Sequence, residues 1–176
     1  GDLTMTGKQL YPVGTMQFEE LVDVYKEQIN VLSEAGCDLL VVETMMSLQE
    51  TRAAVIAAKE TCDLPVIATL SFESDGKTLY GTDAVTAALV LEGLGVDAVG
   101  VNCSTGPEQM VQLVADMRRH IAIPVIAKPN AGMPVIDDRG NAVYSMGPEE
   151  YAVHMQALRD AGARILGGCC GTSANK

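Results

Sequence analysis

The chain has 176 residues, of which 48% are hydrophobic, so it is long enough to bury the core of one domain. Its formal net charge of −11 argues against nucleic acids and anionic membranes as partners, because both require a basic surface. No apolar run approaches the roughly 20 residues that cross a bilayer. No leader pattern opens the chain and its five cysteines follow no disulfide spacing, so we expect a cytoplasmic protein with free thiols.

A unit of amphipathic helix, short turn and apolar strand repeats along the chain. Apolar residues at intervals of three and four indicate the helices, and short continuous apolar runs indicate the strands. Gly36 is expected to end the first helix, and Pro107 and Pro148 to begin two later ones. In chain order, the predicted helix–strand pairs are 18–35 with 39–42, 48–61 with 64–70, 83–94 with 97–101, 107–119 with 123–127, and 148–160 with 163–166.

Apolar strands that alternate with helices predict a parallel sheet that is covered on both faces. Two arrangements fit this pattern, a doubly wound open sheet and a (β/α)8 TIM barrel. The glycine fingerprint of dinucleotide-binding open sheets is absent, whereas polar residues follow several different strands, which is typical of a barrel. The chain holds five of the eight units, and an incomplete wall leaves unpaired strand edges. We therefore expect a partial barrel that belongs to a longer chain.

The cysteines fall into two groups by their position relative to the predicted strands. Cys37 and Cys62 precede strands, and we expect them to be small core residues. Cys103, Cys169 and Cys170 follow strands, at the end where a barrel carries its active site. Three thiolates that converge there would suit Zn²⁺ and leave a fourth position open.

Other interpretations of these three cysteines stay open on spacing alone. They could be buried as small hydrophobes, or the glycines around them (Gly167, Gly168 and Gly171) could form a phosphate-binding loop. The phosphate interpretation does not explain why cysteines occupy the tip of the loop. A zinc ion with three thiolates is a weak Lewis acid but is well suited to hold a substrate thiol as a thiolate, which favours alkyl transfer to sulfur.

Four motifs, in this order along the chain, resemble the homocysteine S-methyltransferase family. The combination of an Asn-Cys pair with a later Gly-Gly-Cys-Cys-Gly-Thr segment is the most specific part of this resemblance. The four motifs are Val42-Glu43-Thr44, Gly100-Val101-Asn102-Cys103-Ser104-Thr105-Gly106-Pro107-Glu108, Lys128-Pro129-Asn130-Ala131-Gly132-Met133-Pro134 and Gly167-Gly168-Cys169-Cys170-Gly171-Thr172.

The resemblance implies that residues 1–176 are the C-terminal portion of a homocysteine-binding (β/α)8 TIM barrel and cover about strands 4 to 8. It implies three zinc ligands, Cys103, Cys169 and Cys170, with no catalytic residue beyond the zinc site. By the same resemblance, Glu43 accepts the substrate ammonium, Thr44 lies near its carboxylate and Asn130 contacts its amino acid portion. From the residues alone, Glu43 could instead be a loop or cap residue, and Asn130 a turn residue.

The segment from Asn130 to Pro134 is more similar to the cobalamin-dependent members of the family than to those that use betaine or S-methylmethionine. The resemblance therefore implies that methylcobalamin, recharged from methyltetrahydrofolate, is the methyl donor. Cobalamin and folate would bind other domains of the same or a partner polypeptide, and residues 1–176 alone would be inactive or bind zinc weakly. The alternative function is a noncatalytic zinc-binding or thiol redox-sensing module, in which Cys169 and Cys170 are oxidised.

Overall fold

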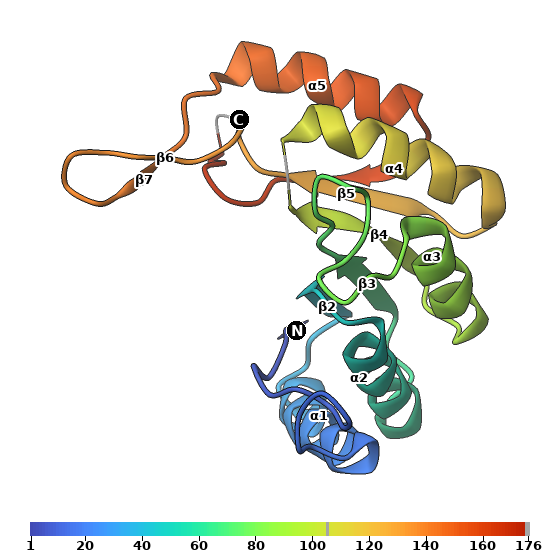
Figure 1. The fold of residues 1–176 in the computed structure, drawn as a ribbon. Coiled ribbons are helices and arrows are strands. Elements are labelled where there is room, and N and C mark those ends of the chain that lie inside the picture. Colours follow the sequence, from blue (N-terminus) through green and yellow to red (C-terminus); the bar gives the residue numbers. More distant parts are fainter. Residues whose placement is uncertain (105, 175–176) are drawn as a thin grey trace.

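A computed structural model describes residues 1–104 and 106–174, and within them six parallel strands form one sheet in the order β1-β2-β3-β4-β5-β8 (Figure 1). The strands of this sheet are β1 (Asp2–Leu3), β2 (Leu40–Met45), β3 (Val66–Leu70), β4 (Ala98–Cys103), β5 (Val125–Pro129) and β8 (Ala163–Leu166). The helices are α1 (Phe18–Glu34), α2 (Leu48–Thr61), α3 (Ala84–Gly93), α4 (Pro107–His120) and α5 (Pro148–Asp160).

Local sequence determines where the helices begin and end. The side chains of Ser47 and Asp83 accept hydrogen bonds from backbone N–H groups at the starts of α2 and α3. Pro107 and Pro148 occupy the first turns of α4 and α5, where a missing N–H costs nothing. Gly36, which follows α1, has a φ of 79°, a value that glycine adopts without strain. The predicted helices are confirmed to within one or two residues at each end.

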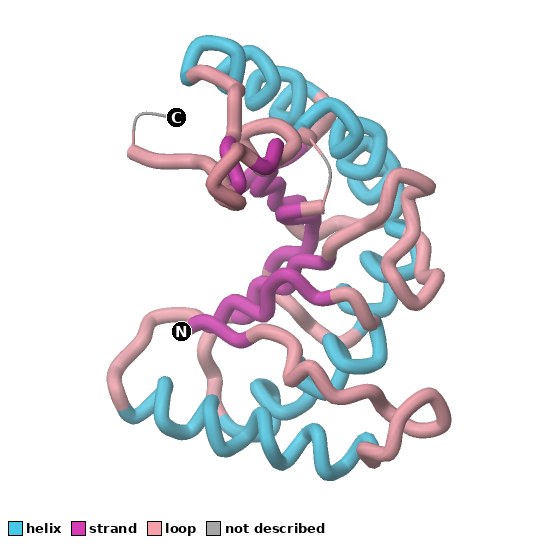
Figure 2. The backbone as a smooth tube through the Cα atoms, turned by 60° about the vertical axis from the view of Figure 1, so that its left-hand side comes forward, coloured by secondary structure: helices cyan, strands magenta, loops and turns pink. Residues whose placement is uncertain are grey.

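The sheet is curved, with the helices on its convex side and its concave side uncovered (Figure 2). Alternate strand residues face the helices, so Val42, Ala68 and Val99 are fully buried in the core. The helices contribute apolar stripes to the same core, such as Leu21 and Ile29 of α1. This is the layer arrangement of a barrel wall rather than of a doubly wound sheet, which carries helices on both faces.

A buried carboxylate connects α1, α2 and the segment that follows β1. Glu50 of α2 is 5% exposed, and its Oε1 accepts hydrogen bonds from the backbone N–H of Thr6 at 2.7 Å and from the hydroxyl of Tyr25 at 3.1 Å. Burial and the charge of Glu50 together raise the pKa of Tyr25. These bonds offset the cost of burying the charge and hold the N-terminal segment beside α2.

Two strand features were not predicted. The first is β1, a strand that the sequence did not indicate because its two residues are too few to show a period. It pairs with β2 through Asp2 and Val41. Between β5 and α5, strands β6 (Val135–Ile136) and β7 (Ala142–Val143) form an antiparallel hairpin that projects from the body (Figure 1). Its tip is closed by Asp137, whose Oδ1 accepts hydrogen bonds from two backbone N–H groups.

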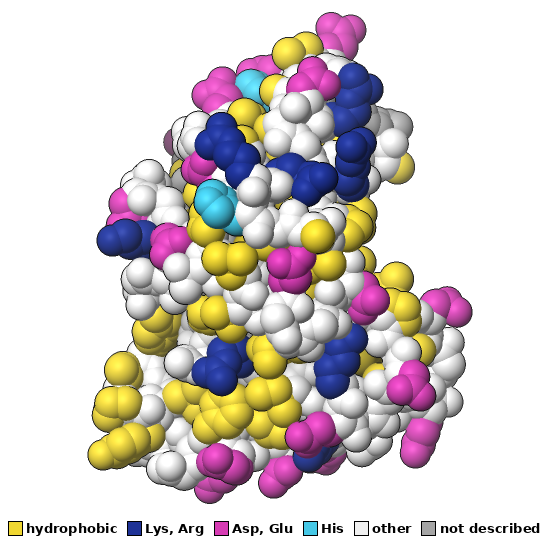
Figure 3. Space-filling view, turned by 90° about the vertical axis from the view of Figure 1, so that its right-hand side faces the viewer, with side chains coloured by type: hydrophobic (Ala, Val, Ile, Leu, Met, Phe, Trp, Pro, Cys, Tyr) yellow, Lys and Arg dark blue, Asp and Glu magenta, His cyan; other side chains and the backbone are white. Residues whose placement is uncertain are grey.

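The outer helical face carries a mixture of charged and hydrophobic side chains (Figure 3). Basic side chains gather in the upper part of this view. The last turn of α4 contains Arg118, Arg119 and His120. Positive charge at this helix end opposes the partial negative charge of the helix dipole. Among the described residues, every helix is too short or too polar to span a membrane.

Gly100 of β4 is a position where the fold tolerates no side chain. A Cβ at this position would overlap the carbonyl oxygen of Ile126 on β5, and that backbone atom cannot move without disturbing the sheet. Gly100→Ala should therefore lower the free energy of unfolding by about 3 kcal/mol. The measurement is chemical denaturation.

Gly93→Ala is the matched control, because a Cβ added to Gly93 at the end of α3 would point into open space. Alanine should leave stability unchanged or raise it by up to about 1 kcal/mol there, since it favours the helix over glycine. Equal destabilisation by the two substitutions would contradict the close approach of β4 and β5.

Candidate metal centre

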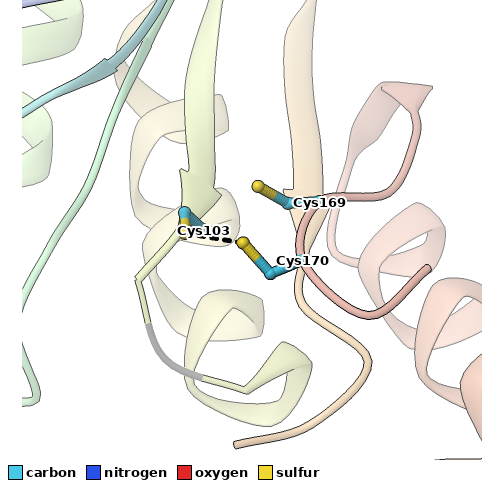
Figure 4. A group of neighbouring side chains, drawn as sticks. All are labelled: Cys103, Cys169 and Cys170. Atoms are coloured by element: carbon cyan, nitrogen blue, oxygen red, sulfur yellow. Dashed lines mark hydrogen bonds between the residues drawn. The ribbon is translucent and has the colours of Figure 1, made fainter. Parts of the chain in front are cut away.

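Three thiols meet at the carboxyl end of the sheet (Figure 4). Cys103 is the last residue of β4, and Cys169 and Cys170 lie in the loop after β8. The three Sγ atoms all lie within 4.8 Å of one another, and those of Cys103 and Cys170 are 3.8 Å apart. These are the three cysteines that the sequence proposed as ligands, whereas Cys37 and Cys62 pack against the hydrophobic core.

Strand β5 separates β4 from β8 and holds the cysteine loop in place. Its Pro129 is in register with Cys103 of β4, and the carbonyl oxygen of Pro129 accepts a hydrogen bond from the Cys169 N–H at 3.0 Å. The next residue, Asn130, is 4% exposed, and its Oδ1 accepts from the Cys170 N–H at 3.1 Å. Asn130 is therefore more than an exposed turn residue, because it positions the backbone of a candidate ligand.

The backbone is strained at this end of the sheet. Thr44, Cys103 and Ser104 have φ values of 59°, 57° and 53°, which side chains other than that of glycine adopt at a cost of roughly 1–3 kcal/mol each. The Oγ of Ser104 donates to the carbonyl oxygen of Asn102 at 2.8 Å and accepts from the Phe72 N–H at 2.9 Å. Such strain is concentrated at functional sites, because only a specific arrangement of side chains compensates for it.

Asn102 is the polar centre of this arrangement and is fully buried. Its Oδ1 accepts from the Thr44 N–H at 3.0 Å, and its Nδ2 donates to the Thr44 Oγ1 at 2.7 Å. The same Nδ2 lies 3.9 Å from the Sγ of Cys169. Asn102 therefore connects β2, β4 and the cysteine loop.

Glu43 and Thr44 lie inside β2, which extends to Met45, rather than in a loop after the strand as the sequence indicated. The carboxylate of Glu43 forms an ion pair with Lys128 of β5, and the two side chains are 26% and 19% exposed. Lys128 is the first residue of one of the family motifs, but the sequence predicted no role for it. Its position as the one charged residue of an apolar strand could have singled it out.

Burial, together with the neighbouring thiols of Cys169 and Cys170, raises the pKa of the Cys103 thiol to about 12. The Cys103 thiol therefore resists ionisation unless a cation joins the cluster. In a tetrahedral site with zinc–sulfur bonds of about 2.3 Å, neighbouring sulfurs lie about 3.8 Å apart. The Cys103–Cys170 separation of 3.8 Å matches this value, so the three residues could hold one metal ion.

Two tyrosines that the sequence did not indicate support the cysteine loop. A Cβ at Gly171, whose φ is 76°, would overlap the ring of Tyr144, so the ring packs directly on the backbone beside Cys170. Burial is the largest cause that raises the pKa of Tyr144, and a hydrogen bond with the Cys170 side chain raises it further. The hydroxyl of Tyr151 lies 3.2 Å from the carbonyl oxygen of Pro129 and 3.1 Å from that of Gly167. No periodicity or motif marks either tyrosine.

The fold and the site together define an α/β barrel protein with a three-cysteine centre at the carboxyl end of its strands. The sequence pattern of the homocysteine S-methyltransferase family matches residues 1–176, so the chain belongs to the homocysteine S-methyltransferase family.

Sequence relatives agree with this assignment. The chain is 34% identical over 173 residues to a methionine synthase of Mycobacterium tuberculosis, which covers 95% of this chain and 14% of the relative. It is 30% identical over 164 residues to homocysteine S-methyltransferase 2 of Arabidopsis thaliana, which covers 90% of this chain and 49% of the relative. The chain thus spans half or less of the length of these curated relatives.

Solved structures confirm the fold class. The apo form of the homocysteine methyltransferase MmuM from Escherichia coli superposes with a TM-score of 0.77 at 22% identity, over 98% of this chain and 58% of that one. Its metallated form gives a TM-score of 0.73 over 90% of this chain and 49% of that one. The predicted TIM barrel, present here in part, is therefore confirmed.

Replacing Asn102 tests its position at the centre of the site. Asn102→Ala removes both bonds to Thr44 and leaves the strained turn without its partner, so it should lower the free energy of unfolding by about 1–3 kcal/mol. Asn141→Ala, the same change on an exposed hairpin residue, should alter it by less than about 0.5 kcal/mol. Thermal or chemical denaturation measures both, and similar losses would contradict the bridging role of Asn102.

Proposed function

We propose that residues 1–176 are the C-terminal portion of a homocysteine-binding (β/α)8 domain. In this proposal the domain takes part in zinc-dependent transfer of a methyl group to the thiol of homocysteine, which gives methionine. The observation that carries the proposal is the cluster of three thiols, whose Sγ atoms lie within 4.8 Å of one another, in a chain of this family.

Cys103, Cys169 and Cys170 would hold the zinc ion, with the fourth position left for the substrate. Bound zinc supplies the acidity that makes a coordinated thiol a thiolate at neutral pH, where a free thiol with a pKa near 8.5 is mostly protonated. The substrate sulfur then forms a bond to the methyl carbon, the donor keeps the electron pair of the broken bond, and the thiol proton passes to solvent. The metallated form of the bacterial homocysteine methyltransferase MmuM supports a metal in a protein of this fold.

The remaining residues bind and orient the substrate in this proposal. Glu43 provides a carboxylate for the substrate ammonium, and Thr44, held by Asn102, lies beside it near the substrate carboxylate. Asn130 contacts the amino acid portion while its amide oxygen holds the cysteine loop. Among the residues that the structure describes, we propose no further catalytic group, because activation of the sulfur depends on the metal.

Methylcobalamin, recharged from methyltetrahydrofolate, is the proposed methyl donor. Its support is the 34% identity to a methionine synthase together with the Asn130–Pro134 segment. Cobalamin and folate would bind other domains of the same or a partner polypeptide, in the cytoplasm, where thiols stay reduced. S-methylmethionine and betaine are the alternative donors, and the identity to the plant homocysteine S-methyltransferase keeps them open.

A second candidate is a noncatalytic zinc-binding or thiol redox-sensing module. The observation that favours it is the 3.8 Å contact between the Sγ atoms of Cys103 and Cys170, of which Cys170 is exposed. A disulfide between them would require their sulfurs to approach from 3.8 Å to about 2.05 Å. Under this alternative no thiol substrate would bind.

Zinc content tests the ligand set. In the full-length protein, Cys103→Ser, Cys169→Ser or Cys170→Ser should reduce bound zinc from one equivalent to a fraction of one after dialysis, because the neutral hydroxyl is a poor ligand in place of a thiolate. Cys37→Ser and Cys62→Ser are the controls, since these cysteines pack against the core away from the cluster, and should keep full zinc. Loss of zinc in a control without unfolding would refute the assignment.

X-ray absorption at the zinc edge separates the two candidate functions. In the methyltransferase proposal, added homocysteine replaces an oxygen or nitrogen ligand with a fourth sulfur, so the average zinc–sulfur coordination rises from three to four. Methionine, which has no thiol, is the control and should leave three sulfurs. A three-sulfur shell that homocysteine does not change would favour the noncatalytic module.

A further inference from the structure

The ion pair between Glu43 and Lys128 has an unusual position. Glu43 belongs to β2 and Lys128 to β5, and strands β3 and β4 lie between them in the sheet. The two side chains therefore do not meet as neighbours on adjacent strands. Val42, which precedes Glu43, is buried on the helix side of the sheet, so Glu43 and its partner lie on the opposite side. The helices leave this concave side uncovered (Figure 2).

The pair lies next to the candidate metal centre. Lys128 is in register with Asn102 of β4, whose Nδ2 lies 3.9 Å from the Sγ of Cys169. The aliphatic stem of Lys128 also packs against the cysteine loop, because a Cβ at Gly167 would lie 3.2 Å from its Cγ. Glu43 directly precedes Thr44, the residue that Asn102 holds.

The charges around this pair do not balance. Asp2 of β1 is a second carboxylate in the same field: burial raises its pKa, the charge of Glu43 raises it further, and Lys128 lowers it. Two carboxylates thus face one ammonium group. The excess negative charge favours a further cation near Glu43, and the three N–H donors of Lys128 allow it to bind a second carboxylate beside that of Glu43.

We propose that Lys128 recognises the carboxylate of the substrate, and that the Glu43–Lys128 pair selects an amino acid thiol over thiols that carry one charge or none. The inference rests on the proposed function, in which the substrate is homocysteine. Its ammonium lies against Glu43 and its carboxylate against Lys128, so that opposite charges alternate. A thiol with only one of these charges satisfies one member of the pair.

This arrangement explains why a lysine is placed among apolar β5 residues. Two half-buried opposite charges lose more hydration energy than a pair of charges on the surface does. A site that binds a zwitterionic substrate uses both charges, which gives a reason for this cost. The pair also holds Glu43 in place before the substrate arrives, which reduces the ordering that binding requires.

The test measures binding of four thiols to the zinc-loaded full-length protein by calorimetry at one pH. Homocysteine carries both charges, 4-mercaptobutyrate lacks the ammonium, 3-mercaptopropylamine lacks the carboxylate, and 1-propanethiol lacks both. In the unmodified protein 4-mercaptobutyrate should bind about 10- to 100-fold more tightly than 1-propanethiol, the ratio expected of one charge-assisted hydrogen bond. Equal affinities would overturn the inference without any variant.

Two variants then separate the members of the pair. Lys128→Met should weaken homocysteine and 4-mercaptobutyrate by about 10- to 100-fold and leave 3-mercaptopropylamine unchanged or tighter. Glu43→Gln should weaken homocysteine and 3-mercaptopropylamine and spare 4-mercaptobutyrate. Lys26→Met is the matched control, because Lys26 pairs with Glu60 between α1 and α2, and should change none of the four affinities.

A uniform loss across all thiols in Lys128→Met would show that the lysine only braces the barrel, and would overturn the proposal. Lys128→Arg keeps the charge and should keep the preference for 4-mercaptobutyrate over 1-propanethiol. If the unmodified protein binds zinc but not homocysteine, the proposed function fails. If it binds homocysteine and Lys128→Met leaves the relative affinities of the four thiols unchanged, only the role of Lys128 fails.

Discussion

The parallel pairing of β4 and β8 with the two sides of β5 is the constraint on which the site depends. Parallel strands present their carboxyl ends at the same edge, so residues that follow β4 and β8 come together although 66 positions separate Cys103 from Cys169. Backbone hydrogen bonds from the cysteine loop to the end of β5 then hold the loop within reach of Cys103. The close approach of β4 and β5 at Gly100 serves the same geometry.

Polar side chains at this edge compensate for an unfavourable backbone. Asn102 contacts both strained residues: its side chain forms hydrogen bonds with Thr44, and Cys103 follows it in the chain. The Glu43–Lys128 pair lies on the concave face one residue before this edge, because Lys128 is in register with Asn102, the residue before Cys103. The thiols and the charged pair are therefore close neighbours. This cluster of three cysteines beside an ion pair is the arrangement on which the proposed recognition of an amino acid thiol rests.

Much of the fold followed from the sequence because its helices carry strong periodicity and unambiguous caps, such as Ser47 and Pro148. The cysteine positions were equally informative, since location after a strand places a residue at one end of a barrel. β1 and the β6–β7 hairpin were missed because two-residue strands show no period and form through pairing partners elsewhere in the chain. The contact of Asn102 with Thr44 was not predicted, because the two residues are 58 positions apart in the sequence.

The sequence by itself determined the alternation of helices and strands, the family and the choice of three cysteines among five, because these depend on local pattern and on residue chemistry. Only the tertiary structure decided which side chains contact one another: the bridge from Asn102 to Thr44, the packing of Tyr144 on Gly171, and the ion pair of Glu43 with Lys128. The reason is that sheet curvature and strand order set these distances. Both arise from packing over the whole chain, so the local sequence does not specify which partner each side chain contacts.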